Sequence, residues 1–257
     1  KLHFKSINID LMYGLPNQSL ESFSKTLDTT IELAPDRIAI YNYAHLPEMF
    51  KPQRRINEDE LPSADEKLNI LQLCIDKLQD AGYVYIGMDH FAKKSDSLVK
   101  AQEEGTLHRN FQGYSTHSDS DIVAMGITAI SRIGDNYSQN VRTIDEYEAR
   151  LKQGIVPVFR GIELEADDVL RREIINQLMC NNKLDIAKLE KKWKIDFASY
   201  FKSSMDNLQQ MADDGLLKIS DKKISITTTG RLLARSICMQ FDRYLKQQKK
   251  SRFSRVI

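Results

Sequence analysis

The order of strand and helix patterns at the beginning of the chain constrains its fold more than any other feature. Residues 7–13 alternate around β-forming side chains and end at the turn sequence Gly14–Pro16. Residues 19–33 then show helical spacing behind an N-capping serine, and residues 37–43 form a second strand pattern. A strand, a helix and a strand of this length predict a right-handed βαβ unit with parallel strands.

The same pattern is repeated once further along the chain. Residues 63–81 have the spacing of an amphipathic helix that ends at Gly82, and residues 83–88 form a third strand pattern. A short helix is predicted over residues 96–104. We expect the buried face of the long helix to consist of Leu68, Leu71, Cys74, Ile75 and Leu78. The first part of the chain is therefore predicted to be α/β and built of βα units.

From about Gly161 onward the patterns become mostly helical. Two short strand patterns around residues 220–222 predict a hairpin, and a last helix is predicted over residues 230–247. Three earlier helices are predicted over residues 167–180, 186–193 and 197–213. Three helices, a hairpin and a final helix are typical of a winged-helix-like domain. We place the two parts of the chain at residues 1–158 and 159–257.

Composition excludes several classes of protein. The 37 Lys and Arg residues nearly balance the 36 Asp and Glu residues, which argues against a general nucleic-acid binder. No apolar run is long enough to predict a membrane span, and no leader-like segment is present, so we expect a cytoplasmic protein. Cys74, Cys180 and Cys238 are far apart in sequence, with neither metal-ligand spacing nor a disulfide framework. No metal site is predicted within this chain.

Polar side chains follow each of the three predicted strands of the first part. Asp10 lies near the C-terminal end of the first strand, and in parallel α/β barrels that edge carries the active site. The polar groups after the other two strands are Asn42, Tyr43, His45, Asp89 and His90. A strand acid that caps the next helix or contacts solvent explains Asp10 equally well.

Two further segments have binding character. Residues 108–114 combine cationic, amide and aromatic side chains in a glycine-hinged loop, although an ordinary surface loop has the same composition. The C-terminal end is basic, which indicates either phosphate or carboxylate binding or simply a solvated terminus. Its cationic residues are Arg231, Arg235, Arg243, Lys246, Lys249, Lys250, Arg252 and Arg255.

Several of these segments resemble one family. Ile9–Pro16 resembles the later strand motif of the radical S-adenosylmethionine enzymes of haem synthesis. Three segments resemble, more narrowly, the oxygen-independent coproporphyrinogen III oxidases: Asn42–Pro47, Ile86–Ala92 and His108–Tyr114. The resemblance continues in Arg160–Ile162, Arg171–Arg172, Leu178–Asn181 and Phe253–Ile257. It implies the C-terminal half of an incomplete parallel (β/α) barrel of the radical S-adenosylmethionine type, followed by the helical, winged-helix-like domain.

The resemblance also implies an activity. In this family a [4Fe-4S] cluster reduces S-adenosylmethionine to a 5′-deoxyadenosyl radical, which starts the oxidative decarboxylation of coproporphyrinogen III to protoporphyrinogen IX without oxygen. Asp10, Ala44 and Ile130 fall at positions that contact S-adenosylmethionine, and Phe111 and Gln112 fall where a second such molecule has been placed. An acid can hold ribose hydroxyls or the amino group, and small or aliphatic residues can bracket adenine.

One part of the family pattern is missing. The C-x-x-x-C-x-x-C motif that holds the cluster is absent, and three scattered cysteines cannot replace it. The chain also starts at Lys1 and enters a strand pattern within a few residues. We therefore expect a C-terminal piece that holds part of the S-adenosylmethionine site, lacks the cluster ligands and is inactive alone. We further expect a monomer without nucleic-acid or membrane partners; the catalytic residues and the electron donor are not indicated.

Two other functions remain open. A winged-helix nucleic-acid-binding protein would need a basic recognition helix. The helix predicted over 197–213 carries Lys202 but also Asp206, Asp213 and, just beyond it, Asp214, a poor fit for a phosphate backbone. The other alternative is a haem-binding or haem-transfer relative of the same family without dehydrogenase activity.

Overall fold

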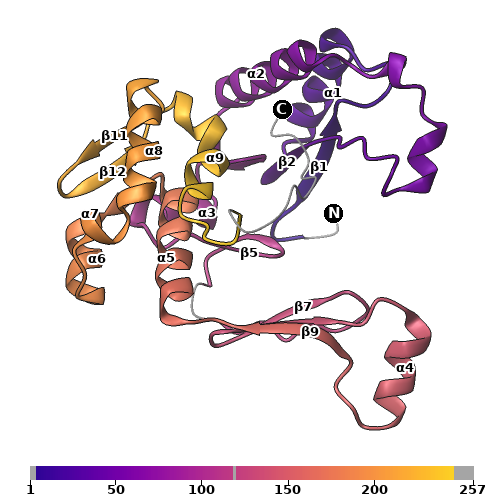
Figure 1. The fold of residues 1–257 in the computed structure, drawn as a ribbon. Helices are drawn as coiled ribbons and strands as arrows, with labels where there is room; N and C mark the ends of the chain where they lie inside the picture. The colour runs from indigo at the N-terminus through magenta and orange to yellow at the C-terminus, as the bar shows by residue number, and fades with distance from the viewer. Residues whose placement is uncertain (1–3, 118–119, 246–257) are drawn as a thin grey trace.

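The computed structural model of the chain describes residues 4–117 and 120–245, and it begins with the expected βαβ unit (Figure 1). Strands β1 (Asn8–Tyr13) and β2 (Arg37–Asn42) pair in parallel, and helix α1 (Leu20–Leu33) connects them. The unit predicted from the sequence is confirmed.

Local interactions explain where α1 begins and ends. Ser19 and Ser22 form a capping box, in which each side chain accepts a hydrogen bond from the other residue's backbone N–H. Ala34 ends the helix in the left-handed conformation. Phe23 and Leu27 lie on the buried face of the helix and pack into the core beneath the sheet.

Helix α2 (Ala64–Asp80) covers the same face of the sheet, and its N-cap is Ser63. Its buried residues are Ile70, Cys74, Ile75 and Leu78. The expected place of Leu68 on this face is wrong, because that side chain is 40% exposed. The stripe runs through positions four residues apart, and Leu68 lies outside it. Two short 3₁₀ helices, Lys51–Arg55 and Glu58–Glu60, precede α2.

The third strand departs from the expected parallel pattern. Strand β3 (Tyr83–Gly87) turns directly into β4 (His90–Lys93), and β4 inserts between β3 and β2, antiparallel to both. The strand order is β1-β2-β4-β3, so the expectation of a purely parallel sheet is wrong and the sheet is mixed. In the two-residue turn Met88 adopts a positive φ of 54°. A methionine in the sequence does not predict this conformation.

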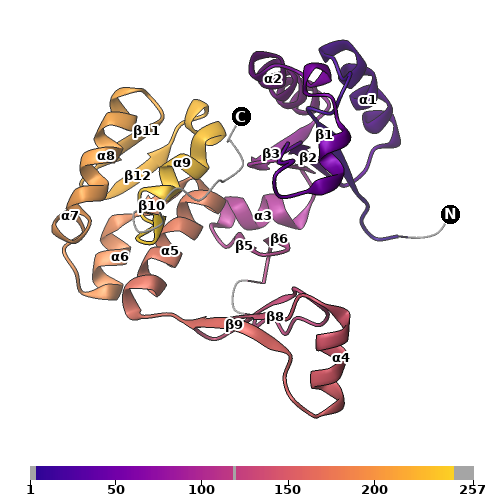
Figure 2. The ribbon, with the colours of Figure 1, turned by 45° about the vertical axis from the view of Figure 1, so that its right-hand side comes forward.

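Helix α3 (Ser97–Glu104) follows, as predicted, with Asp96 as its N-cap. A small hairpin, β5 (His108–Asn110) and β6 (Gly113–Ser115), then occupies the loop that was singled out for binding. A lobe that we call the arm (residues 120–163) projects away from the rest of the chain in both views (Figures 1 and 2). It contains an antiparallel sheet and one helix: β7 (Ile130–Ile133), β8 (Asn136–Asn140), α4 (Ile144–Lys152) and β9 (Val158–Glu163). The boundary placed after residue 158 falls at the start of β9.

The remaining part, the helical unit (residues 164–245), has its own antiparallel sheet in the order β10-β12-β11. Its helices and strands are α5 (Ala166–Asn181), β10 (Lys183–Asp185), α6 (Ile186–Trp193), α7 (Phe197–Tyr200), α8 (Lys202–Asp213), β11 (Leu217–Ser220), β12 (Lys223–Ile226), the 3₁₀ helix Thr229–Leu233 and α9 (Ala234–Met239). The helix predicted over 197–213 is interrupted at Phe201, whose ring is buried against Phe197 and Phe241.

The last helix is shorter than predicted. The expected helix over 230–247 ends at Met239, and residues 246–257, which include the basic end and Phe253–Ile257, lie outside the described residues. Beyond α9, the backbone carbonyl of Phe241 accepts a hydrogen bond from Arg171. The Asp242 carboxylate accepts hydrogen bonds from the backbone N–H groups of Tyr244 and Leu245. These contacts satisfy polar groups outside a helical ladder and hold the chain in turns.

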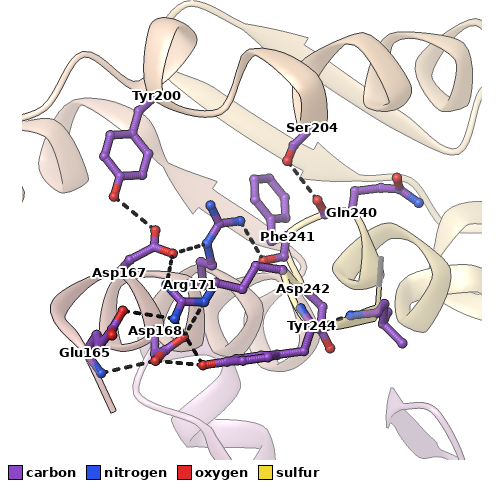
Figure 3. Close-up of polar contacts among 12 residues, drawn as sticks. Glu165, Asp167, Asp168, Arg171, Tyr200, Ser204, Gln240, Phe241, Asp242 and Tyr244 are labelled. Atoms are coloured by element: carbon purple, nitrogen blue, oxygen red, sulfur yellow. Dashed lines mark hydrogen bonds and ion pairs between the residues drawn. The ribbon is translucent and has the colours of Figure 1, made fainter. Parts of the chain in front are cut away.

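A network of charged groups fixes this C-terminal segment to the start of α5 (Figure 3). The Asp167 carboxylate accepts hydrogen bonds from Arg171 at 2.8 Å and from Arg243 at 3.0 Å. The Asp168 carboxylate accepts one from the Tyr244 hydroxyl at 3.1 Å and pairs with Arg243 at the same distance. Among the described residues, no helix has the length and apolar character that a membrane crossing needs.

Candidate functional site

A large cavity, of about 950 Å³, lies where β1 and β2 end, beside the beginning of α2. Residues 41–46 form one wall, and residues 231–235 of the helical unit close the other side. Tyr85, Asp89 and Arg109 contribute to its wall next to β3 and β5. The sequence predicted functional residues at this edge of the sheet. The edge lines a cavity of the size that small-molecule sites have.

The polar residues after β2 and β3 form two pairs at this cavity. The Asp89 carboxylate lies 2.5 Å from Nδ1 of His90. Nε2 of His45 lies 3.4 Å from the Glu58 carboxylate, and its Nδ1 lies 3.3 Å from the Tyr43 hydroxyl. Each histidine is thus held by a carboxylate, an arrangement that fixes ring orientation.

Tyrosines around the cavity keep their protons at neutral pH. Burial raises the pKa of Tyr13 and of Tyr85 to about 12. Burial also raises the pKa of Tyr41, and the carboxylates of Asp10 and Asp89 raise it further while Arg109 opposes them. These hydroxyls are therefore hydrogen-bond donors at neutral pH.

Asp10 and Ala44 both belong to the sheet region. Asp10 is the third of six residues of β1, so its expected place near the end of the strand is wrong. It is exposed and accepts a hydrogen bond from Asn8 at 2.5 Å. Ala44 lines the large cavity, and its carbonyl accepts a hydrogen bond from Gln53 at 3.1 Å.

The other three predicted site residues lie elsewhere. Phe111 and Gln112 form the tip of the β5–β6 hairpin, and Ile130 begins β7 in the arm. The exposed Phe111 ring packs edge-on against Tyr137 of β8, with 5.5 Å between centroids, and lines a second cavity of about 530 Å³. The five predicted residues therefore divide between the sheet and the hairpin-arm region.

Of the four cations that line the large cavity, the sequence analysis had named Arg109, Arg231 and Arg235 within segments of binding character, but it missed Lys67. Arg109 lines both cavities, and Lys67 reaches the larger one from α2. Arg231 belonged to the basic C-terminal end, but nothing in the sequence showed that it would lie against Tyr85. A signal for Arg109 was present in the segment His108–Tyr114, whereas Lys67 looks like any polar helix residue.

The described residues contain no group of three or more His, Cys, Asp or Glu side chains placed to hold a metal ion. Burial raises the pKa of the Cys74, Cys180 and Cys238 thiols to about 12. A metal-binding cysteine is a thiolate, so these buried thiols do not fit the role of cluster ligands.

Comparison with known proteins extends the picture to the whole chain. The model of the HemN C-terminal domain family matches residues 164–233. The oxygen-independent coproporphyrinogen III oxidase of Pseudomonas aeruginosa is 52% identical over all of this chain, which spans 56% of that protein. The enzyme of the same name from Thermostichus vulcanus is 43% identical, and the match covers 99% of this chain and 78% of that protein.

The chain belongs to the oxygen-independent coproporphyrinogen III oxidase family. The resemblance found in the sequence is thereby confirmed. A solved structure of coproporphyrinogen III oxidase (HemN) from Escherichia coli, described as a radical SAM enzyme, has a TM-score of 0.92 and 49% identity. That match covers 94% of this chain and 56% of the solved one. The chain thus spans about half the length of several oxygen-independent coproporphyrinogen III oxidases that it matches.

Proposed function

We propose that the protein to which this chain contributes converts coproporphyrinogen III to protoporphyrinogen IX without oxygen, by radical S-adenosylmethionine chemistry. The observation that carries this proposal is the match along the whole chain to oxidases of that name, at 52% identity in one case. The large cavity, with tyrosines and an excess of cations in its wall, suits a substrate that combines an apolar ring with carboxylates.

We also propose the finer description of the fold. The parallel pair β1 and β2 with α1 supports the C-terminal half of a radical S-adenosylmethionine barrel. In the helical unit, three antiparallel strands with α5, α6 and α8 support a winged-helix-like domain, with the boundary placed after residue 158. The cytoplasmic location and the monomeric state stay predictions.

Part of the S-adenosylmethionine site fits the residues present. The exposed Asp10 carboxylate retains acceptor positions besides its contact with Asn8, and Ala44 offers a small side chain in the wall of the large cavity. We propose that Asp10, Ala44 and Ile130 hold one S-adenosylmethionine and that Phe111 and Gln112 contact a second. When bound and reduced, this group supplies the hydrogen-abstracting species. The buried thiols do not fit the [4Fe-4S] cluster, so we derive no step through it from this chain.

The chain's own residues have defined roles in this proposal. The Tyr41 ring lies edge-on to His90, with 6.2 Å between centroids, and His90 lies edge-on to Tyr114 at 5.2 Å. These contacts place the three rings in one row, and burial raises the pKa of Tyr41 and of Tyr114, so both tyrosines present hydroxyl donors rather than phenolates. Asp89 holds the imidazole of His90 and thereby fixes the orientation of the row.

The test is turnover by the whole protein, purified without oxygen and supplied with coproporphyrinogen III, S-adenosylmethionine and a reductant. We expect vinyl-bearing products in chromatography, and none from the 257-residue chain alone. Asp10→Asn should weaken S-adenosylmethionine binding about tenfold, since a charge-assisted hydrogen bond to a hydroxyl is lost. The control Asp80→Asn, at the exposed end of α2, should change nothing. Tetrapyrrole binding without turnover would instead favour a haem-binding relative.

A further inference from the structure

The wall of the large cavity carries more positive than negative charge. Four cationic side chains line it: Lys67 of α2, Arg109 of β5, and Arg231 and Arg235 near the start of α9. They come from segments that are far apart in sequence, and the tertiary fold brings them to one space.

Two carboxylates line the same cavity, and both have other partners. Glu58 lies 3.4 Å from Nε2 of His45, and Asp89 lies 2.5 Å from Nδ1 of His90. Neither forms an ion pair with a cation of the cavity wall among the described residues. The wall therefore has an excess of two positive charges, even before any charge on the histidines is considered.

The guanidinium of Arg109 is one of the cations in this wall that lack a hydrogen-bonded or ionic partner among the described residues. Its backbone N–H donates to Asn176 at 3.3 Å, which fixes the strand, but its guanidinium forms no hydrogen bond or ion pair with the described residues. Its Nε is buried without a partner, and the guanidinium carbon lies 5.6 Å from the centre of the Tyr114 ring. An arginine held in this way costs stability unless a ligand pairs with it.

Lys67 lacks a hydrogen-bonding or ionic partner within the described residues, and burial lowers its pKa. Its stem passes over Gly14, where an added Cβ would lie 2.9 Å from Cε of Lys67. The glycine, with its φ of +85°, therefore leaves the space through which the lysine reaches the cavity. The Asn42 Oδ1 atom beside this path is also buried without a partner.

Arg231 is held in place without being neutralised. Its guanidinium donates to the backbone carbonyls of Tyr85 and Ile86 and lies 5.0 Å from the centre of the Tyr85 ring. Carbonyls orient a guanidinium but do not cancel its charge, and its Nε has no partner. Arg231 is thus a rigid, charged donor in the cavity wall.

We propose that Arg109, Arg231 and Lys67 bind carboxylate groups of the substrate. This inference rests on the proposed function for the identity of the ligand, coproporphyrinogen III, whose four propionates can neutralise the excess charge. S-adenosylmethionine has one carboxylate and carries positive charge as well, so it does not supply two net negative charges. The buried tyrosines of the wall, such as Tyr13 and Tyr85, suit the apolar ring that joins the carboxylates.

The test is a titration of the whole protein with coproporphyrin III, an oxidised macrocycle that carries the same four carboxylates. The change in porphyrin absorbance gives the Kd. Arg109→Met and Lys67→Met should each raise the Kd about tenfold to a hundredfold, since each removes charge-assisted hydrogen bonds. Arg109→Lys should lose less. Lys25→Met is the control, because Lys25 is exposed on α1 and pairs with Glu21.

The tetramethyl ester of coproporphyrin III, which has no carboxylate, separates charge from shape. Its Kd should be the same for the parent protein and for both Met variants. Melting temperatures should show that the variants fold, because neither side chain forms a hydrogen bond or ion pair with the described residues. Parent-like Kd values for coproporphyrin III in both Met variants would overturn this inference while turnover by the parent left the proposed function intact. Carboxylate-dependent binding without turnover by the parent would support this inference and contradict the proposed function.

Discussion

The helical unit and the arm are neighbours in the chain but are stabilised in different ways. The helical unit has an extensive core, which includes Leu178, Phe197, Phe201, Leu208 and Phe241. The arm exposes large apolar side chains instead: Val123, Met125, Ile127, Ile133, Ile144, Leu151, Ile155, Val156, Phe159 and Ile162. One unit thus derives its stability from burial, whereas the other depends on its backbone ladder and on polar contacts.

Polar contacts replace a core in the arm. The Asn140 side chain is buried and donates to the carbonyls of Ala124 and Gly126 at 3.3 and 2.9 Å. The Tyr147 hydroxyl accepts from the Gly126 N–H at 2.9 Å, and Arg150 donates to the Val158 carbonyl at 2.8 Å. Such contacts specify a shape but contribute less than a packed core.

The sharpest test of the comparison is to remove the same ring from both regions. Phe201→Ala in the helical unit should lower the free energy of unfolding by about 4 kcal/mol, since it leaves a cavity among buried aromatic rings. Phe159→Ala in the arm, where the ring is 51% exposed, should cost about 0.5 kcal/mol or less. Urea unfolding measures both. Equal losses would mean that the arm is packed against other parts of the protein.

A glycine substitution gives the next largest contrast. A Cβ at Gly230 would overlap the backbone carbonyl of Leu216, so Gly230→Ala should cost about 3 kcal/mol. Gly154 of the arm has open space around it and a φ of +70°, so Gly154→Ala should cost about 1 kcal/mol from backbone strain alone. Thermal unfolding compares the two. A mild Gly230 variant would show that the contact with Leu216 relaxes easily.

The polar contacts of the arm can be tested at Asn140. Asn140→Ala leaves the Ala124 and Gly126 carbonyls without their donor and should cost about 2 kcal/mol. Amide hydrogen exchange should accelerate in β7 and β8, while exchange in α5 stays as in the parent. Faster exchange in α5 as well would contradict the separation of the two regions.

The smallest expected effect is a pH dependence of the helical unit. Burial would raise the pKa of Asp167, but hydrogen bonds from Arg171, Arg243 and Tyr200 outweigh it and lower the pKa. Because the folded pKa lies below the unfolded value near 3.8, this stabilisation is present above that pH and is lost as pH falls through the folded pKa. Asp167→Asn should flatten the dependence of the free energy of unfolding on pH below about pH 3.8, which urea unfolding at several pH values measures.

Elements that depend on interactions between residues close in sequence were predicted well, and elements that depend on long-range pairing were not. Helices α1, α2 and α6 have caps and apolar periodicity within their own residues, and these were predicted closely. Strand β4 was missed because it has only four residues, and its turn at Met88 carries no hairpin signal. Strand β10 is shorter still, with three residues, and it pairs with β12.

The candidate site shows the same limit. Asp10 and Ala44 were found through local motifs, but Lys67 and Arg231 gained their meaning only when the cavity brought them together. A periodic pattern assigns a lysine of α2 to a polar face and cannot show that Gly14 opens a path for it. Cavities are products of long-range packing, which a single sequence does not display.

The insertion of β4 has a consequence for the order in which the sheet assembles. The β3–β4 hairpin closes across two residues and can form in about 1–10 μs, whereas β4 meets β2 across about fifty residues. We therefore expect the pairing of β4 with β2 to be the later step. It forms a short seam, in which residues 37–39 meet residues 90–92. Tyr41 and Asp89 lie on opposite sides of that seam and line the same cavity. Local opening of the sheet at this seam would therefore widen the large cavity.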